Sequence, residues 1–184
     1  MRLTLIRFTK TLAAVLVLLT ALPVAAQDWT TVWRDPEVVN YELTMDKIRK
    51  LVTVQRAMTA LSASQPDVPA KIDADMKAMQ KNRTAPATVA EAAALLDRHP
   101  SMRAIFANNG MTAREWLAIS GAMSTAAVFL ILEQRQSSSG SPASSLTAVQ
   151  KANVALLKQN QAEWKKIEEE FRRLAAETAP ATKR

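Results

Sequence analysis

Residues 116–132 read WLAISGAMSTAAVFLIL, a run of 17 residues without a single charge. Directly before it, Thr112-Ala113-Arg114-Glu115 has the pattern of a capping box, in which a threonine oxygen and a glutamate carboxylate satisfy free amides at the start of a helix. The run is apolar on almost every side, so it is either the buried centre of a helical domain or a membrane segment. We expect a buried helix, because small polar residues dilute the run and because its length falls short of the roughly 20 residues that span a bilayer.

Start and stop signals predict further helices on both sides of this run. Capping residues, prolines and apolar residues spaced three and four apart indicate long helices over 44–64, 67–82 and 146–177, and short helices over 88–99 and 100–109. The chain has three glycines and one tyrosine, and is rich in Ala, Leu, Lys, Gln and Glu, which favours helix over sheet. We therefore expect an all-α fold, a helical bundle of about four long and two short helices.

The first 26 residues have the layout of a cleavable secretory signal peptide. Arg2, Arg7 and Lys10 precede a short apolar run, and the small residues 24–26 offer a cleavage point before Gln27. An N-terminal membrane anchor is the alternative, but the apolar run is shorter than the roughly 20 residues that span a bilayer. A lipoprotein would need a cysteine at the cut, and the chain has none. We expect a protein exported to the bacterial periplasm or the extracellular space.

Composition divides the chain into six segments. A run of Ser, Gly and Pro before Leu146 is the clearest boundary and is typical of a linker. The expected segments are the signal peptide 1–26, an irregular N-terminal arm 27–43, a helical core 44–135, the linker 136–145, a long C-terminal helix 146–177 and a tail 178–184.

The net charge of +7 comes partly from the signal peptide. Cleavage removes three of the 24 basic residues and none of the 17 acidic ones, which leaves +4 on the mature chain. An exported chain without a concentrated basic stripe is not expected to bind nucleic acid. A weak contact with anionic membrane surfaces stays open. Without cysteine, packing alone must hold the fold, and thiol catalysis, thiolate metal sites and c-type haem attachment are excluded.

Aromatic residues at the two ends of the mature chain are candidate contacts for a partner. Trp29 and Trp33 either pin the N-terminal arm onto the domain or form an exposed anchor. The 146–177 helix would be roughly 48 Å long, so we expect part of its apolar seam, which includes Trp164 and Phe171, to extend past its neighbours and bind a partner. Asn153 and Asn160 occupy seam positions, where polar residues set register.

Residues suited to catalysis or metal binding are sparse. His99 is the only histidine, which excludes a histidine triad and a multi-histidine zinc site. With Met102 it could form part of a copper or haem site. Separately, Met76 and Met79 form a thioether pair that would suit a soft metal, although methionines at helical spacing are ordinarily core filler. We expect no catalytic residue, no cofactor and no metal site, so the chain is not expected to be an enzyme.

One short motif resembles a known family. Leu146-Thr147-Ala148-Val149-Gln150 is similar to the LTxxQ pattern of the CpxP/Spy-like periplasmic chaperones, which are exported, helical and without catalytic sites. That family carries the motif twice, whereas residues 43–47 match only its first two positions. The resemblance implies a chaperone-like role. We expect a non-catalytic envelope protein that binds other proteins or associates with itself, the alternative being a carrier of haem, metal or a small molecule in the bundle interior.

Overall fold

The computed structural model describes residues 32–82, 86–135 and 146–178. The predicted signal peptide, Trp29, the predicted linker and all but the first residue of the predicted tail lie outside these ranges. Every regular element within them is a helix, which confirms the all-α prediction. The elements are a 3-10 turn η1 (Val32–Arg34) and the helices α2 (Pro36–Val39), α3 (Met45–Ser64), α4 (Asp67–Lys81), α5 (Val89–Asp97), α6 (Pro100–Asn108), α7 (Ala113–Arg135), α8 (Ala148–Gln159) and α9 (Gln161–Thr178).

Local capping determines where these helices begin. Thr88 and Thr147 each form a complete capping box, with Glu91 and Gln150 as the third helical residues. The amide of Glu115 donates to Oγ1 of Thr112 at the start of α7. After α6, Gly110 takes a φ of 60°, the left-handed conformation that glycine adopts without a Cβ clash. The predicted helix starts are therefore confirmed within one or two residues.

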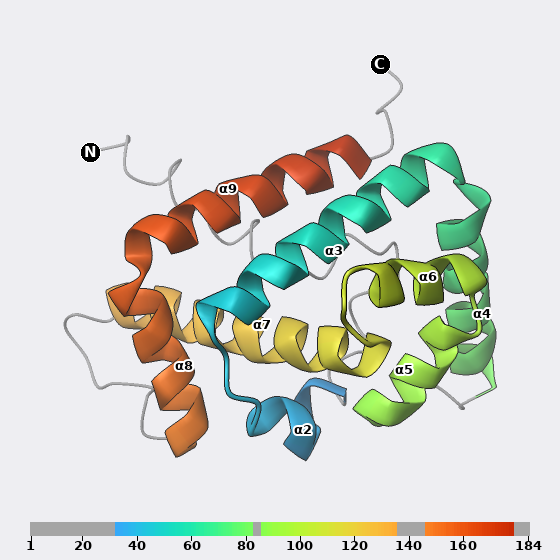
Figure 1. Ribbon diagram of the computed structural model, residues 1–184. Coiled ribbons are helices and arrows are strands. Elements are labelled where there is room, and N and C mark those ends of the chain that lie inside the picture. Colours follow the sequence, from blue (N-terminus) through green and yellow to red (C-terminus); the bar gives the residue numbers. More distant parts are fainter. Residues whose placement is uncertain (1–31, 83–85, 136–145, 179–184) are drawn as a thin grey trace, which may run out of the picture.

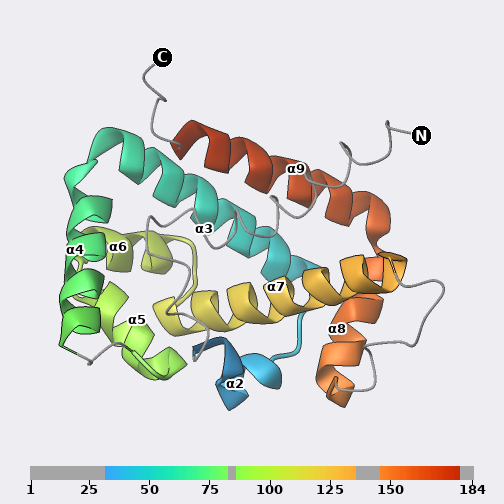
Figure 2. The ribbon, with the colours of Figure 1, turned by 180° about the vertical axis from the view of Figure 1, so that it is seen from behind.

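Three helices lie side by side through the molecule, in the order α9, α3, α7 (Figures 1 and 2). α3 and α9 run in the same direction, and α7 runs in the opposite one. α8 crosses one end of α7, α5 and α6 pack near its other end, and α2 lies against its outer side. α7 contacts α2, α3, α5, α6 and α8. Its uncharged sequence suits this central position, because a helix that is apolar on almost every side has to be covered on almost every side.

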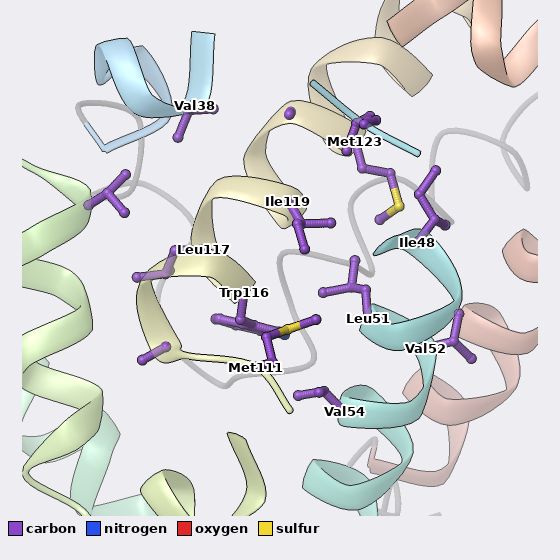
Figure 3. Packing of buried hydrophobic residues seen from close by; sticks show 14 of the residues in the cluster. Val38, Ile48, Leu51, Val52, Val54, Met111, Trp116, Leu117, Ile119 and Met123 are labelled. Carbon is purple, nitrogen blue, oxygen red and sulfur yellow. The ribbon is translucent and has the colours of Figure 1, made fainter. Parts of the chain in front are cut away.

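The side chains of α7 form the middle of the core. Figure 3 shows Ile119 and Met123 of α7 facing Ile48 and Leu51 of α3, and all four are buried. Among the described residues, Ala113–Glu133 is the one stretch long and apolar enough to cross a membrane, and 61% of its most apolar window is buried within the protein. Val128, 41% exposed, is its clearest exception. This burial agrees with the expected core helix.

The long C-terminal helix of the prediction is two helices. α8 ends at Gln159 and α9 begins at Gln161, with Asn160 between them at φ −110° and ψ 32°. The Asn160 amide donates to the carbonyl of Leu156, and its own carbonyl accepts from Trp164, so one residue ends α8 and starts α9. Because α8 packs on α7 while α9 packs on α3, the break lets both apolar faces be buried, which one straight helix of roughly 48 Å could not achieve.

The N-terminal segment is also more regular than predicted. Residues 32–34 and 36–39, expected as part of an irregular arm, form η1 and α2. Asp35 is the reason, because its Oδ1 accepts from the amide of Glu37 and caps α2, while its Oδ2 accepts from Val89 at the start of α5. A single carboxylate thus starts one helix and joins it to a second.

Candidate functional site

Of the four aromatic residues predicted to contact a partner, the structure describes three, and two of these are packed inside the protein. Trp33 is half-buried over Gly121 of α7, where an added Cβ would lie 2.5 Å from Cε3 of the indole. Trp164 and Phe171 are 2% and 3% exposed, in the core on the α3 side of α9. The expected exposure of Trp164 and Phe171 is wrong, because the break at Asn160 turns their face inward. Trp33 attaches the N-terminal segment to the domain and does not form an exposed anchor, which is the first of the two alternatives given for it above.

Asn153 connects α8 to the backbone between α2 and α3, a role that its seam position alone did not predict. Its Oδ1 accepts from the buried amide of Leu43 at 2.9 Å, and its Nδ2 donates to the carbonyl of Tyr41 at 2.8 Å. The side-chain amide therefore pairs with the backbone between α2 and α3 much as a neighbouring strand would. Asn160, the other predicted seam residue, donates only to the carbonyl of Leu156 in its own helix.

A ladder of ion pairs joins the exposed edges of α3 and α9. Arg49 donates through Nε and Nη2 to the two carboxylate oxygens of Glu163, at 2.6 and 3.0 Å. Seven residues further along both helices, Nε of Arg56 donates to Oε1 of Glu170 at 2.7 Å. The same offset in both pairs shows that the helices are parallel and in a fixed register.

These ion pairs shift the pKa values of the groups that form them. The hydrogen bond from Arg49 lowers the pKa of the Glu163 carboxyl group. The pKa of Glu170 is lowered first by Arg173 of its own helix and then by Arg56. The pKa of Glu168, on the same helix, is instead raised, because burial disfavours its charged form. Glu163 and Glu170, the two carboxylates of α9 that pair with α3, are therefore held in their ionised form.

Two adjoining hollows follow this ladder. The first, of about 450 Å³, is lined by Arg49, Val52, Thr53, Arg56, Glu163, Lys166, Ile167 and Glu170. The second, of about 390 Å³, is lined by Arg56, Thr59, Ala60, Ser62, Ala63, Arg173, Leu174, Glu177 and Thr178. Because Arg56 lines both hollows, they form one surface, which we name the α3/α9 groove. Its lining mixes cationic, anionic and hydroxyl groups over an apolar floor.

A third hollow, of about 350 Å³, lies beside the start of α7. It contains Tyr41, whose hydroxyl donates to Oε1 of Glu115 at 3.4 Å and whose ring lies 4.4 Å from Nζ of Lys47. Burial, followed by the nearby Glu115 carboxylate, raises the pKa of Tyr41 to about 12. A phenol held in its neutral form can donate a hydrogen bond, but it is unsuited to act as a base at neutral pH.

His99 lies at the start of α6 and is 6% exposed. Its Nε2 is 3.4 Å from Oδ2 of Asp75 and has no hydrogen-bond partner within the described part of the chain. Across residues 32–82, 86–135 and 146–178, no three His, Cys, Asp or Glu side chains converge to hold a metal ion. The described residues thus bring together one histidine and one carboxylate at this point, which is too few donors for a complete site of these ligand types.

The chain matches no family model, no curated protein and no solved structure in the comparisons made with known proteins.

Sequence reasoning missed the α3/α9 groove. Its signal was present, since Arg49 and Arg56 are seven residues apart and so are Glu163 and Glu170. A shared spacing does not say which two helices pair, because charged residues at such spacings also occur on solvated faces. The pairing depends on the break at Asn160, which lets α9 pack on α3.

Proposed function

We propose that this chain is an exported, non-catalytic helical bundle that binds another polypeptide along the α3/α9 groove. The observation that carries the proposal is the groove itself, two adjoining hollows whose rims carry fixed charges of both signs. Export is supported by the signal-like sequence of residues 1–26.

The dimensions of the groove suit an extended segment. Successive ion pairs of the ladder are seven residues apart, so they are separated by roughly 10 Å along the helices. From Arg49 to Ala63 the groove then covers about 21 Å, the length of roughly six residues of extended chain. A small ligand would occupy one hollow, whereas a polypeptide can occupy both.

The chemistry of the groove favours binding over catalysis. The Glu163 and Glu170 carboxylates are ionised and already paired with arginines, so they are poor proton donors at neutral pH. The apolar floor, at Val52, Ile167 and Leu174, offers contact for side chains of a partner, and the charged rim supplies hydrogen bonds.

The test measures how the protein affects aggregation of reduced lysozyme, followed by light scattering. The chain has no cysteine, so the reductant that unfolds lysozyme leaves its covalent structure unchanged. The variant Thr53→Tyr with Ala60→Tyr fills both hollows from exposed positions of α3. The control, Ala104→Tyr with Ala152→Tyr, adds the same side chains at exposed positions outside the groove.

We expect the unmodified protein and the control to delay aggregation and the groove variant to lose this effect, with all three equally helical by circular dichroism. Equal protection by the groove variant and the control would contradict the proposal, as would no protection by any of them. Sedimentation velocity of each protein alone shows whether the occupant is a second copy, since a dimer lost only in the groove variant would make self-association the function.

A further inference from the structure

The second hollow of the α3/α9 groove lies where the ion-pair ladder stops. The register that pairs Arg49 with Glu163 and Arg56 with Glu170 brings residue 63 opposite Glu177. Residue 63 is alanine, so α3 supplies no cation at the third position. Ala60, Ser62 and Ala63 leave the space of about 390 Å³ that an arginine at this position would enter.

The helix ends add negative potential to the same hollow, which Arg56, Arg173 and Glu177 already line with charges of both signs. α3 and α9 are parallel, so their C-terminal ends, at Ser64 and Thr178, lie at the same end of the pair (Figure 1). Each C-terminus carries about half a negative charge from its aligned peptide dipoles. Neither helix has a basic residue in its last turn, where one is stabilising.

A buried hydroxyl in the hollow has no partner. Thr59 is 7% exposed, and its Oγ1 has no hydrogen bond within the described part of the chain. By contrast, Thr53 and Ser62 of the same helix donate to the carbonyls four residues before them. A buried hydroxyl without a partner costs free energy, and a donor in the hollow would remove that cost once the Thr59 side chain turns its Oγ1 towards it.

The two arginines at the hollow are already engaged. Nε of Arg56 and Nη2 of Arg173 both donate to Oε1 of Glu170, at 2.7 Å each. Nη1 of Arg173 lies 3.8 Å from Glu177, too far for a hydrogen bond. Glu177 therefore forms an ion pair with Arg173 but no hydrogen bond among the described residues, and its side chain, 48% exposed, can still accept one from a ligand.

We propose that the second hollow binds the cationic side chain, arginine or lysine, of the polypeptide that occupies the groove. The side chain takes the third position of the ladder: its charge pairs with Glu177 and with the two helix ends, and one of its N–H groups donates to Oγ1 of Thr59. This inference rests on the proposed function, and it adds the chemical class of residue that the partner must present.

The test is a nuclear magnetic resonance titration of the full chain with N-acetyl-arginine amide, which carries one guanidinium group. The uncharged N-acetyl-citrulline amide has nearly the same shape, and N-acetyl-glutamate amide carries the opposite charge. We expect saturable shifts at the amides of Ser62, Ala63, Glu177 and Thr178 with the arginine probe, and none with the other two.

Variants separate this site from general attraction between charges. Glu177→Gln should weaken binding of the arginine probe about tenfold, the loss expected for one charge-assisted hydrogen bond. Glu169→Gln removes the same charge from an exposed position of α9 and should leave binding unchanged. Ala63→Arg supplies the missing cation from α3 itself and should abolish binding of the arginine probe. Thr59→Val removes the hydroxyl but keeps nearly the same side-chain shape, and it should weaken binding of the arginine probe.

Preference for the glutamate probe, or equal effects of Glu177→Gln and Glu169→Gln, would overturn the inference. If lysozyme aggregation still depends on the groove while the arginine probe does not bind the hollow, only this inference fails. If the groove variant protects lysozyme as well as its control does, the proposed function fails instead.

Discussion

At the scale of single residues, Asp35, Gly121 and Asn153 attach the segment before α3 to the rest of the protein. Asp35 joins α2 to α5, Gly121 leaves room for Trp33, and Asn153 pairs with the backbone on both sides of Glu42. Each contact joins residues more than 50 positions apart in the sequence. Single substitutions at these residues should therefore affect the stability of the whole fold.

Asn153→Ala should lower the free energy of unfolding by about 2–3 kcal/mol, because the buried amide of Leu43 and the carbonyl of Tyr41 lose their partner. Asn160→Ala is the matched control, since it removes only a bond within one helix end, and it should cost less than about 1 kcal/mol. Urea denaturation of both variants measures the difference. Equal losses would show that the pairing with the 41–43 backbone adds no stability.

Gly121→Ala should destabilise the fold by about 1–3 kcal/mol, because the new methyl group overlaps Trp33 and Val38. Trp33→Leu alone also loses packing, but it makes room for the methyl group. The double variant should consequently lose less than the two single variants together. Strict additivity in thermal melts would mean that Trp33 does not lie over Gly121.

Tyr41 is the only tyrosine, so the ultraviolet absorbance of its phenolate reports this one group. Its pKa is raised from 10.0 to about 12, so the unfolded chain loses the proton first as pH rises. The neutral phenol of Tyr41 therefore stabilises the folded state. This contribution to the free energy of unfolding is complete below pH 10 and is lost between pH 10 and 12. Glu115→Gln should move the native midpoint down without returning it to 10, because burial is the larger cause. A native midpoint near 10 would contradict the packing described for Tyr41.

At the scale of elements, α9 is part of the core, and its attachment to α3 is both apolar and ionic. Its inner face buries Trp164, Ile167, Phe171 and Leu174, while its edge carries the ladder to Arg49 and Arg56. Burial of aromatic and aliphatic side chains supplies most of the stability of such a contact, and exposed ion pairs add on the order of 0.2–1 kcal/mol each. The ladder therefore sets the register of α3 against α9 more than it holds them together.

Phe171→Ala should cost about 3–5 kcal/mol and destabilise the whole helical fold, because it leaves a cavity beside α3. Arg172→Ala, on the exposed face of the next residue, should change stability by less than about 0.5 kcal/mol. Circular dichroism during urea denaturation distinguishes one cooperative transition from two. Loss of α9 alone, with the other helices still folded, would mean that it is a separable arm after all.

At the scale of the whole molecule, the sequence predicts where the helices begin far better than which helices pack against each other. Capping at Thr88, Thr112 and Thr147 is a property of four consecutive residues, so it can be read locally. The break at Asn160 could not be read in this way, because the apolar spacing continues through it. It follows from packing, since α8 covers α7 while α9 covers α3.

The groove depends on that same packing. Its lining comes from segments more than 100 residues apart, and each segment alone has the pattern of an ordinary solvated helix face. The predicted binding residues Trp164 and Phe171 are aromatic, which made them candidates, but their burial leaves the neighbouring charged edge as the accessible surface. The class of function expected from the sequence, binding without catalysis, stays a prediction.

Photocrosslinking measures most directly whether a polypeptide occupies the groove. A photoreactive phenylalanine analogue is placed at position 53 or 60 in the groove, or at the exposed positions 104 and 152 outside it, and each protein is irradiated with reduced lysozyme. We predict lysozyme adducts from positions 53 and 60 and only background from 104 and 152. Equal adducts from all four positions, or adducts from 104 and 152 alone, would show that the groove between α3 and α9 is not where this protein contacts lysozyme.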